Sequence, residues 1–138
     1  MPESPSTAAP RLVFVYGTLR RGESNDITRL EPSPRFVGRG CARGVLYDLG
    51  PYPGARFGDD DWVVGEVFAI EAALEQRLDE IEEILPEPTG EYDKRLVTVN
   101  LDGDARLQCL AYELSTTAAQ GRARVSGGDW AMRASQPR

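Results

Sequence analysis

The apolar positions of the chain fall into short runs that are typical of strands. The run at 11–16, RLVFVY, ends at Gly17 and predicts a buried strand followed by a loop. A second run at 62–70, WVVGEVFAI, predicts another strand. Between 36 and 49, apolar residues recur among three glycines. Glycine inside a strand pattern marks bulges or sharp bends, so we expect a bent strand there, as at the corner of a small barrel.

Residues 71–85 carry the clearest helical pattern. Their large apolar residues recur three or four positions apart, which places them on one face of a helix. Pro86 ends the helix, because a residue that precedes proline avoids helical dihedral angles. The predicted apolar stripe consists of Leu74, Leu78, Ile81 and Leu85.

Two further runs, 91–99 and 105–114, flank Asp102-Gly103 and predict a β-hairpin. Residues 50–54, GPYPG, predict a rigid turn. The segment 115–138 has no strong periodicity, and its Gly128-Asp129-Trp130 motif is expected to attach the tail to the domain. A chain of strands with one good helix predicts an α+β fold built around a small barrel or bent sheet.

The length of 138 residues fits one domain. We expect a disordered lead at 1–10, a single domain at 11–132 and a mobile tail at 133–138. The lead lacks the basic start and apolar middle of a secretory signal, which favours the cytoplasm. Cys41 and Cys109 have no CxxC spacing, which argues against a thiolate metal site. We expect them to be reduced packing residues, and the sequence leaves open whether the two form a disulfide.

The amino-acid composition excludes several classes of partner and catalytic site. Lys and Arg total 16 against 22 Asp and Glu, so the net charge is −6, which argues against nucleic acid and anionic membranes as partners. No apolar run approaches the roughly 20 residues of a membrane span. Histidine is absent, which excludes Ser-His and Cys-His nucleophilic pairs and His-ligated metal sites. Any acid–base chemistry must therefore come from carboxylates or tyrosines.

The turn of Tyr16, Gly17, Thr18 and Leu19 is the first candidate for that chemistry. A glycine directly after a buried strand lets consecutive N–H groups point outward, where they can bind a carboxylate or an oxyanion. The alternative is an ordinary strand-to-loop turn, which is common.

Glu82 is the second candidate. With about 100° per residue and Leu74 at zero, Glu82 falls near 80°, on the flank of the apolar stripe. Partial burial there would raise a carboxyl pKa towards neutrality. Glu71 and Glu75 lie on the same flank, and a solvated acidic face is the commoner fate of helical glutamates. Glu83, Asp79 and Glu80 fall well off the stripe.

Tyr92 and Tyr112 lie in or near the two strands of the hairpin. A strand tyrosine normally packs its ring in the core and exposes its hydroxyl, so a structural role is the default. The arginines at 20, 21 and 35 could contact an acidic substrate, but we expect them to be solvated.

Taken in order, these segments resemble the gamma-glutamylcyclotransferase-like family. Each motif is short, and the ordered combination from about residue 11 to 130 is what carries the resemblance. The carrying segments are Val15-Tyr16-Gly17-Thr18-Leu19-Arg20-Arg21-Gly22, Gly44-Val45-Leu46-Tyr47-Asp48-Leu49-Gly50, Tyr52-Pro53-Gly54, Val64-Gly65-Glu66-Val67-Phe68, Leu78-Asp79-Glu80-Ile81-Glu82, Tyr92-Asp93-Lys94-Arg95 and Ser126-Gly127-Gly128-Asp129-Trp130. Glu83 stands where family members often have glycine.

The resemblance implies a small mixed β-barrel with flanking helices. It also implies an enzyme that cyclises a gamma-glutamyl group to 5-oxoproline, releases an amine or amino acid, and needs no metal or organic cofactor. Glu82 matches the family's acid/base glutamate, and Tyr92 and Tyr112 are expected to line the pocket beside the turn at 16–19. The alternatives are a catalytically silent module that binds small molecules on the same fold, and a related acyl transfer on a gamma-glutamyl group.

Overall fold

The structure is a computed structural model that describes residues 11–23, 25–50, 52–81, 92–103 and 105–130. The predicted lead at 1–10 and tail at 133–138 lie outside these residues, so the domain boundaries stay predictions. The elements in chain order are β1 (Arg11–Val15), the 3-10 turn η2 (Ile27–Arg29), β2 (Arg35–Asp48), β3 (Pro53–Ile70), α1 (Ala72–Ile81), β4 (Tyr92–Leu101), β5 (Arg106–Leu114), α2 (Thr116–Ala119), β6 (Ala123–Arg124) and the 3-10 turn η3 (Ser126–Gly128).

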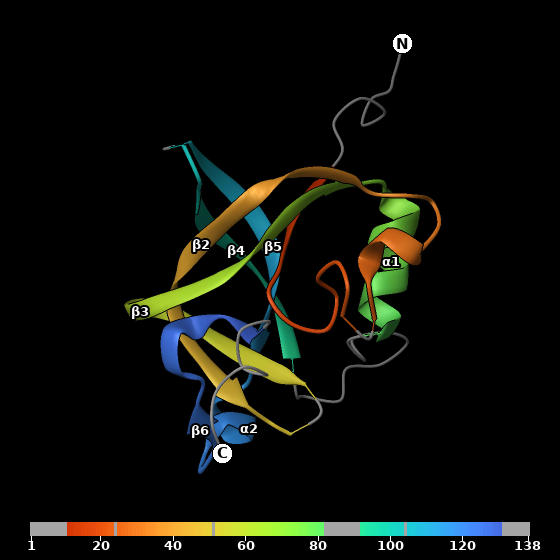
Figure 1. Ribbon diagram of the computed structural model, residues 1–138. Coiled ribbons are helices and arrows are strands. Elements are labelled where there is room, and N and C mark those ends of the chain that lie inside the picture. Colours follow the sequence, from red (N-terminus) through yellow and green to blue (C-terminus); the bar gives the residue numbers. More distant parts are fainter. Residues whose placement is uncertain (1–10, 24, 51, 82–91, 104, 131–138) are drawn as a thin grey trace.

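The first five strands close into a barrel (Figure 1). β1 lies between β3, which is antiparallel to it, and β5, which is parallel to it. β5 pairs with β4, β4 with β2, and β2 returns to β3, which completes the ring. The short β6 adds to the end of β2. The predicted α+β fold with a small mixed barrel is confirmed.

The barrel owes its curvature to β2 and β3, which form one long hairpin. Their register shifts between Phe36 and Gly38 and again between Arg43 and Gly44. A Cβ at Gly44 would lie 2.5 Å from the carbonyl oxygen of Arg56, so only glycine permits the strands to approach there. The bulges expected from the glycines of this segment are confirmed. β3 is longer than the strand predicted at 62–70, because it already begins within the expected turn at 50–54.

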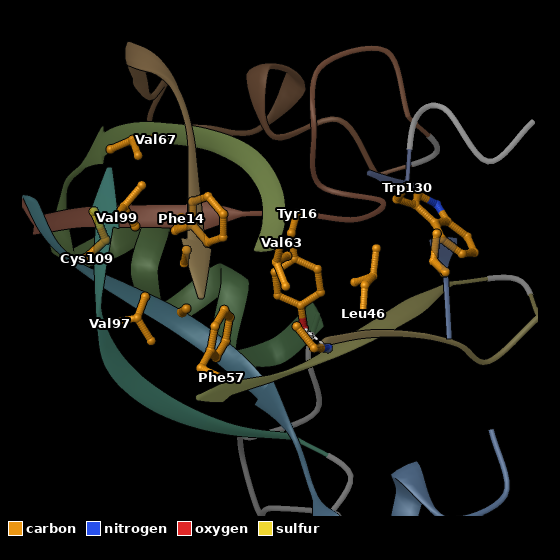
Figure 2. Packing of buried hydrophobic residues seen from close by; sticks show 14 residues of the cluster. Phe14, Tyr16, Leu46, Phe57, Val63, Val67, Val97, Val99, Cys109 and Trp130 are labelled. Carbon is orange, nitrogen blue, oxygen red and sulfur yellow. Dashed lines mark hydrogen bonds between the residues drawn. The ribbon is translucent and has the colours of Figure 1, made fainter. Parts of the chain in front are cut away.

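β1 is buried on both faces, which explains its unbroken apolar run. Phe14 and Tyr16 face the barrel interior, while Val13 and Val15 face a second core beneath α1. Figure 2 shows the interior cluster, with the rings of Phe14, Tyr16 and Phe57 close together. β1 therefore connects the barrel core to the helix, and the turn that follows it lies where the two meet.

The helix α1 buries a different arc from the one the stripe predicts. Leu74 and Leu78 are fully buried, as expected, but Ile81 is 36% exposed and Asp79 is only 6% exposed. On the wheel Asp79 lies about 140° from Leu74 and Ile81 about −20°, so the buried arc is rotated towards Asp79. The reason is tertiary, since polar side chains of β4 and β5 meet Asp79 on that side. Leu85 and Pro86 lie outside the described residues.

The two cysteines are free thiols. Cys109 is fully buried in the barrel interior, as predicted, and burial raises its pKa to about 11. Cys41, also predicted to be a packing residue, is only half-buried. No helix within the described parts of the chain is long and apolar enough to cross a membrane.

Candidate functional site

The chain turns directly after β1, where the sequence predicts a loop. The N–H of Arg20 donates to the carbonyl oxygen of Gly17 over 3.0 Å and closes the turn. A Cβ at Gly17 would lie 2.5 Å from Cγ of Pro53, so glycine is required for the first residues of β3 to pack against the turn. The turn is therefore held against β3 by a contact that no other residue type permits.

The carbonyl groups of the turn accept hydrogen bonds, whereas its N–H groups donate none to the residues that the structure describes. The carbonyl oxygens of Thr18 and Leu19 accept from the N–H groups of Asn25 and Ile27 over 2.8 and 2.9 Å. Among the described residues, no hydrogen bond uses the N–H of Gly17, Thr18 or Leu19 as its donor. Three consecutive N–H groups that have no acceptor in the described part of the chain suit an anion or a developing negative charge on oxygen.

Tyr16 connects the turn to β5 and β3. Its hydroxyl donates to the carbonyl oxygen of Tyr112 over 2.6 Å and accepts from the N–H of Ala55 over 3.1 Å. Figure 2 shows the Tyr16 ring pointing into the interior cluster, with its hydroxyl at the end of a dashed hydrogen bond. The hydroxyl is thus satisfied by main-chain groups from two neighbouring strands.

The hydroxyl of Tyr92 donates to the carbonyl oxygen of Pro53 over 2.7 Å. Pro53 is the residue that packs against Gly17, so Tyr92 stabilises the turn indirectly, through Pro53. Tyr92 and Tyr112 are 6% and 3% exposed, which agrees with the default expectation that their rings lie in the core. Their hydroxyls are bonded to protein, contrary to the expectation that strand tyrosines expose them.

The hydroxyl of Tyr112 donates to Oδ1 of Asp79 in α1 over 2.6 Å. Lys94 of β4 donates to Oδ2 of Asp79 over 3.0 Å and to Glu75 over 2.7 Å. Burial lowers the pKa of Lys94, but its hydrogen bonds to Glu75 and Asp79 outweigh burial and raise the pKa. Sequence analysis missed Asp79, because the wheel placed it away from the stripe and the partners come from distant strands.

The structure brings several predicted site residues into one cluster. Leu19, Tyr92 and Tyr112 pack together with Leu74 and Leu78 of α1. In Figure 1, the loop after β1 lies beside α1. Glu82, the predicted acid/base, is the residue after the last residue of α1 and lies outside the described residues, as does Glu83.

A second buried network holds the far side of the loop after β1. Nη1 of Arg20 donates to Asp129 over 2.6 Å, and Glu66 accepts from the N–H of Arg21 over 3.0 Å. Arg20 is only 5% exposed, so the expectation that it is solvated is wrong. Its guanidinium is covered because the segment 126–130 folds over it. This segment carries Asp129, whose carboxylate neutralises the charge of the guanidinium. The prediction that Gly128-Asp129-Trp130 attaches the tail to the domain is confirmed.

Within the described ranges, no group of three or more Asp, Glu, Cys or His side chains is arranged to hold a metal ion. The cluster between the turn and α1 brings together tyrosines, main-chain amides and the buried acid Asp79. These groups are suited to binding and moving protons on an organic substrate.

Comparison with known proteins gives these features a family context. The model of the family described as gamma-glutamyl cyclotransferase, AIG2-like matches residues 13–132. CG2811 of Drosophila melanogaster, provisionally named a gamma-glutamylcyclotransferase, is 34% identical over 110 residues, which are 72% of this chain and 67% of that protein. A provisionally named gamma-glutamylcyclotransferase of Vibrio cholerae is 38% identical over 81 residues, which are 53% of this chain and 63% of that protein.

Solved structures share the fold. The crystal structure of an AIG2-like protein from Mus musculus matches this chain with a TM-score of 0.67 at 27% identity. The match covers 78% of this chain and 79% of the mouse chain. YkqA from Bacillus subtilis has the same TM-score and identity and covers 88% of this chain, but this chain corresponds to only 39% of YkqA.

Proposed function

Because the chain belongs to the gamma-glutamyl cyclotransferase, AIG2-like family, we propose that it cyclises the gamma-glutamyl group of a small molecule. The products are 5-oxoproline and a released amine or amino acid. The observation that carries the proposal is the run of N–H groups at Gly17, Thr18 and Leu19. They lack acceptors among the described residues and lie beside the cluster that holds α1.

These N–H groups bind the carboxylate of the substrate or the oxyanion that forms at its gamma-carbon. Tyr16, Tyr92 and Tyr112 frame the substrate site. Their hydroxyls hold the start of β3 in place through Ala55 and Pro53, and the last described turn of α1 through Asp79, which supports a positioning role for the three rings. A positioned turn is what an intramolecular reaction needs most, because geometry supplies much of its rate.

Glu82 is the general acid/base in this proposal. It follows directly on α1, whose residues Leu78 and Asp79 are both buried. On the helical wheel, position 82 falls near 80°, between these two residues at about 40° and 140°. The rotation of the buried arc towards Asp79 thus favours Glu82 over Glu83, which falls near 180°.

The reaction moves two protons from the attacking nitrogen to the leaving nitrogen. Glu82 accepts a proton from the substrate's alpha-ammonium group, and the neutral amine attacks the gamma-carbonyl carbon. The bond from nitrogen to the gamma-carbon forms, and the negative charge passes to the carbonyl oxygen near the three N–H groups. When the bond from the gamma-carbon to the leaving nitrogen breaks, Glu82 returns this proton to the leaving nitrogen. The ring nitrogen gives up its second proton, which passes through Glu82 to the released amine, so that the amine departs as its ammonium form. The step uses no other reactant.

The test is release of 5-oxoproline from a panel of gamma-glutamyl amines, gamma-glutamyl dipeptides and glutathione. We expect turnover of at least one member and a loss on the order of 100- to 10,000-fold in the Glu82→Gln variant, which removes the acid/base group. The matched control is Glu83→Gln, which makes the same change at the next residue and should retain turnover.

Three results would contradict the proposal. If turnover survives Glu82→Gln but is lost in Glu83→Gln, Glu83 and not Glu82 transfers the proton. A ligand that raises the melting temperature with no 5-oxoproline formed from any member of the panel would indicate a silent binding module. Transfer of the gamma-glutamyl group to an added amine, without cyclisation, would indicate a related acyl transferase.

A further inference from the structure

Tyr112 is the point at which the two halves of the proposed site meet. Its carbonyl oxygen accepts from the hydroxyl of Tyr16, the residue immediately before Gly17. Its own hydroxyl donates to Asp79 near the end of α1. Both hydrogen bonds are 2.6 Å long and buried. A single residue of β5 therefore contacts the turn with its main chain and the helix with its side chain.

We infer that Tyr112 and Asp79 are positioning residues that set the distance between the N–H groups of the turn and the acid/base that follows α1. The inference rests on the proposed function for the identity of that acid. Asp79 lies in the last described turn of α1, three residues before position 82. The Asp79 side chain is therefore well placed to hold this turn of the helix against β5.

The surroundings of Asp79 support this role over simple packing. A buried carboxylate is costly unless it is hydrogen-bonded, and a nonpolar residue would fill the same space at lower cost. Here both oxygens are used, one by Tyr112 and the other by Lys94. Lys94 also binds Glu75 one turn earlier, so the helix is held to β4 and β5 at two successive turns. Bonds of this kind fix direction, whereas the apolar contacts of Leu74 and Leu78 do not.

The kinetic test compares Tyr112→Phe with Tyr47→Phe. Tyr112→Phe removes the hydroxyl that reaches Asp79 and keeps both the ring and the main-chain acceptor for Tyr16. Tyr47 packs at the edge of the same cluster, and its hydroxyl makes no hydrogen bond among the described residues. We expect Tyr112→Phe to lower kcat by on the order of 10- to 100-fold, because a misplaced acid loses alignment with the reacting atoms. Its KM should stay within about threefold, and Tyr47→Phe should leave both constants unchanged.

Two variants of Asp79 separate positioning from stability. Asp79→Asn keeps an oxygen that accepts from Tyr112, and Asp79→Ala does not. Asp79→Ala should lower kcat as Tyr112→Phe does, Asp79→Asn should restore most of it, and the Tyr112→Phe/Asp79→Ala double variant should be no slower than Asp79→Ala alone. Additive losses in the double variant, equal losses in Asp79→Asn and Asp79→Ala, or a changed KM with an unchanged kcat would each overturn the inference.

A readout that needs no activity keeps this test apart from that of the proposed function. Amide hydrogen exchange across 72–81 should become faster in Tyr112→Phe and in Asp79→Ala, and should be unchanged in Tyr47→Phe. If the wild type releases no 5-oxoproline, the proposed function fails, and unchanged exchange in Tyr112→Phe would then overturn the positioning role as well. If the wild type is active and Tyr112→Phe changes neither kcat nor exchange, only the positioning role is wrong.

Discussion

Arg20 and Asp129 form a buried ion pair of 2.6 Å between residues 109 positions apart. Arg20 directly follows the turn at 17–19, and Asp129 belongs to the segment 126–130 that folds back over the barrel. Nε of Arg20 is buried without a hydrogen-bond partner in the described part of the chain, and Glu66 lies 3.9 Å away from it. The pair therefore carries most of the neutralisation of a guanidinium that has lost its water.

Removing the acid of this pair should be costly. Asp129→Ala leaves a buried positive charge without its nearest partner, and we expect the free energy of unfolding to fall by about 3 kcal/mol. The control is Arg39→Gln, because Arg39 is largely exposed and reaches Asp129 only at 3.4 Å, so its loss should cost less than about 1 kcal/mol. Urea denaturation measures both. Equal losses would mean that burial of Arg20 does not make the pair important.

Gly17 is required for packing between the turn and β3. In Gly17→Ala the new Cβ would meet the Pro53 ring at 2.5 Å, and a proline ring has little freedom to move away. We expect a loss of about 1–3 kcal/mol in stability together with a fall in kcat/KM for 5-oxoproline release, because the N–H groups are displaced. Gly58→Ala is the matched change, since a Cβ there meets nothing within 4 Å. If Gly17→Ala changes neither stability nor kcat/KM, Pro53 can move aside and the contact does not require glycine.

The buried arc of α1 can be tested with two apolar residues of the predicted stripe. Leu78 is fully buried and Ile81 is 36% exposed. Leu78→Ala should lower the free energy of unfolding by about 2–5 kcal/mol through lost burial and a cavity. Ile81→Ala should cost less than about 1 kcal/mol, as changes at exposed positions do. Comparable losses at the two sites would restore the stripe that periodicity predicts.

Asp26 contributes a pH-dependent term to stability. Burial raises its pKa, but hydrogen bonds from Thr28 and from the N–H of Gly22 outweigh burial and hold the pKa below the ordinary 3.8. The stabilisation is therefore present above pH 3.8 and is lost as the pH falls through the lower folded value. The Asp26→Asn variant should be less stable than the wild type at pH 7, and the difference should shrink in acid. Denaturant titrations at pH 7, 4 and 3 measure it, and a difference independent of pH would contradict the assignment.

The strands and the helix could be predicted from periodicity because local patterns report burial directly. β1 is unbroken and apolar, since it has a core on each side, and the hairpin of β4 and β5 turns at Gly103, whose φ is +96°. The glycines at 38 and 44 marked the places where β2 shifts register. Each of these features depends on residues that are close in sequence, which is why they could be read there.

The candidate site also contains residues that a local sequence signal reveals and residues that only distant contacts reveal. The turn at Gly17 could be found because glycine after a strand is a local signal, and its contact with Pro53 was then added by the fold. Asp79 and Arg20 could not be found, because a charged residue in a helix or loop has the same local pattern whether it is solvated or buried. Only the partners decide between these outcomes, and they lie 15 and 33 residues away for Asp79 and 109 for Arg20.

The order of apolar runs and glycines was enough to predict strands that bend and one helix, because each run must bury its apolar face and each glycine permits a bend. The residue pattern left open whether the strands form a small barrel or a bent sheet, and the pairing of β2 with β3 and β4 decided for the barrel. Which charged groups enter the interior was settled only when β4, β5 and the tail came together around them. The reason is energetic, since burial of a charge is favourable only beside its partner, and that partner is brought there by the folded chain.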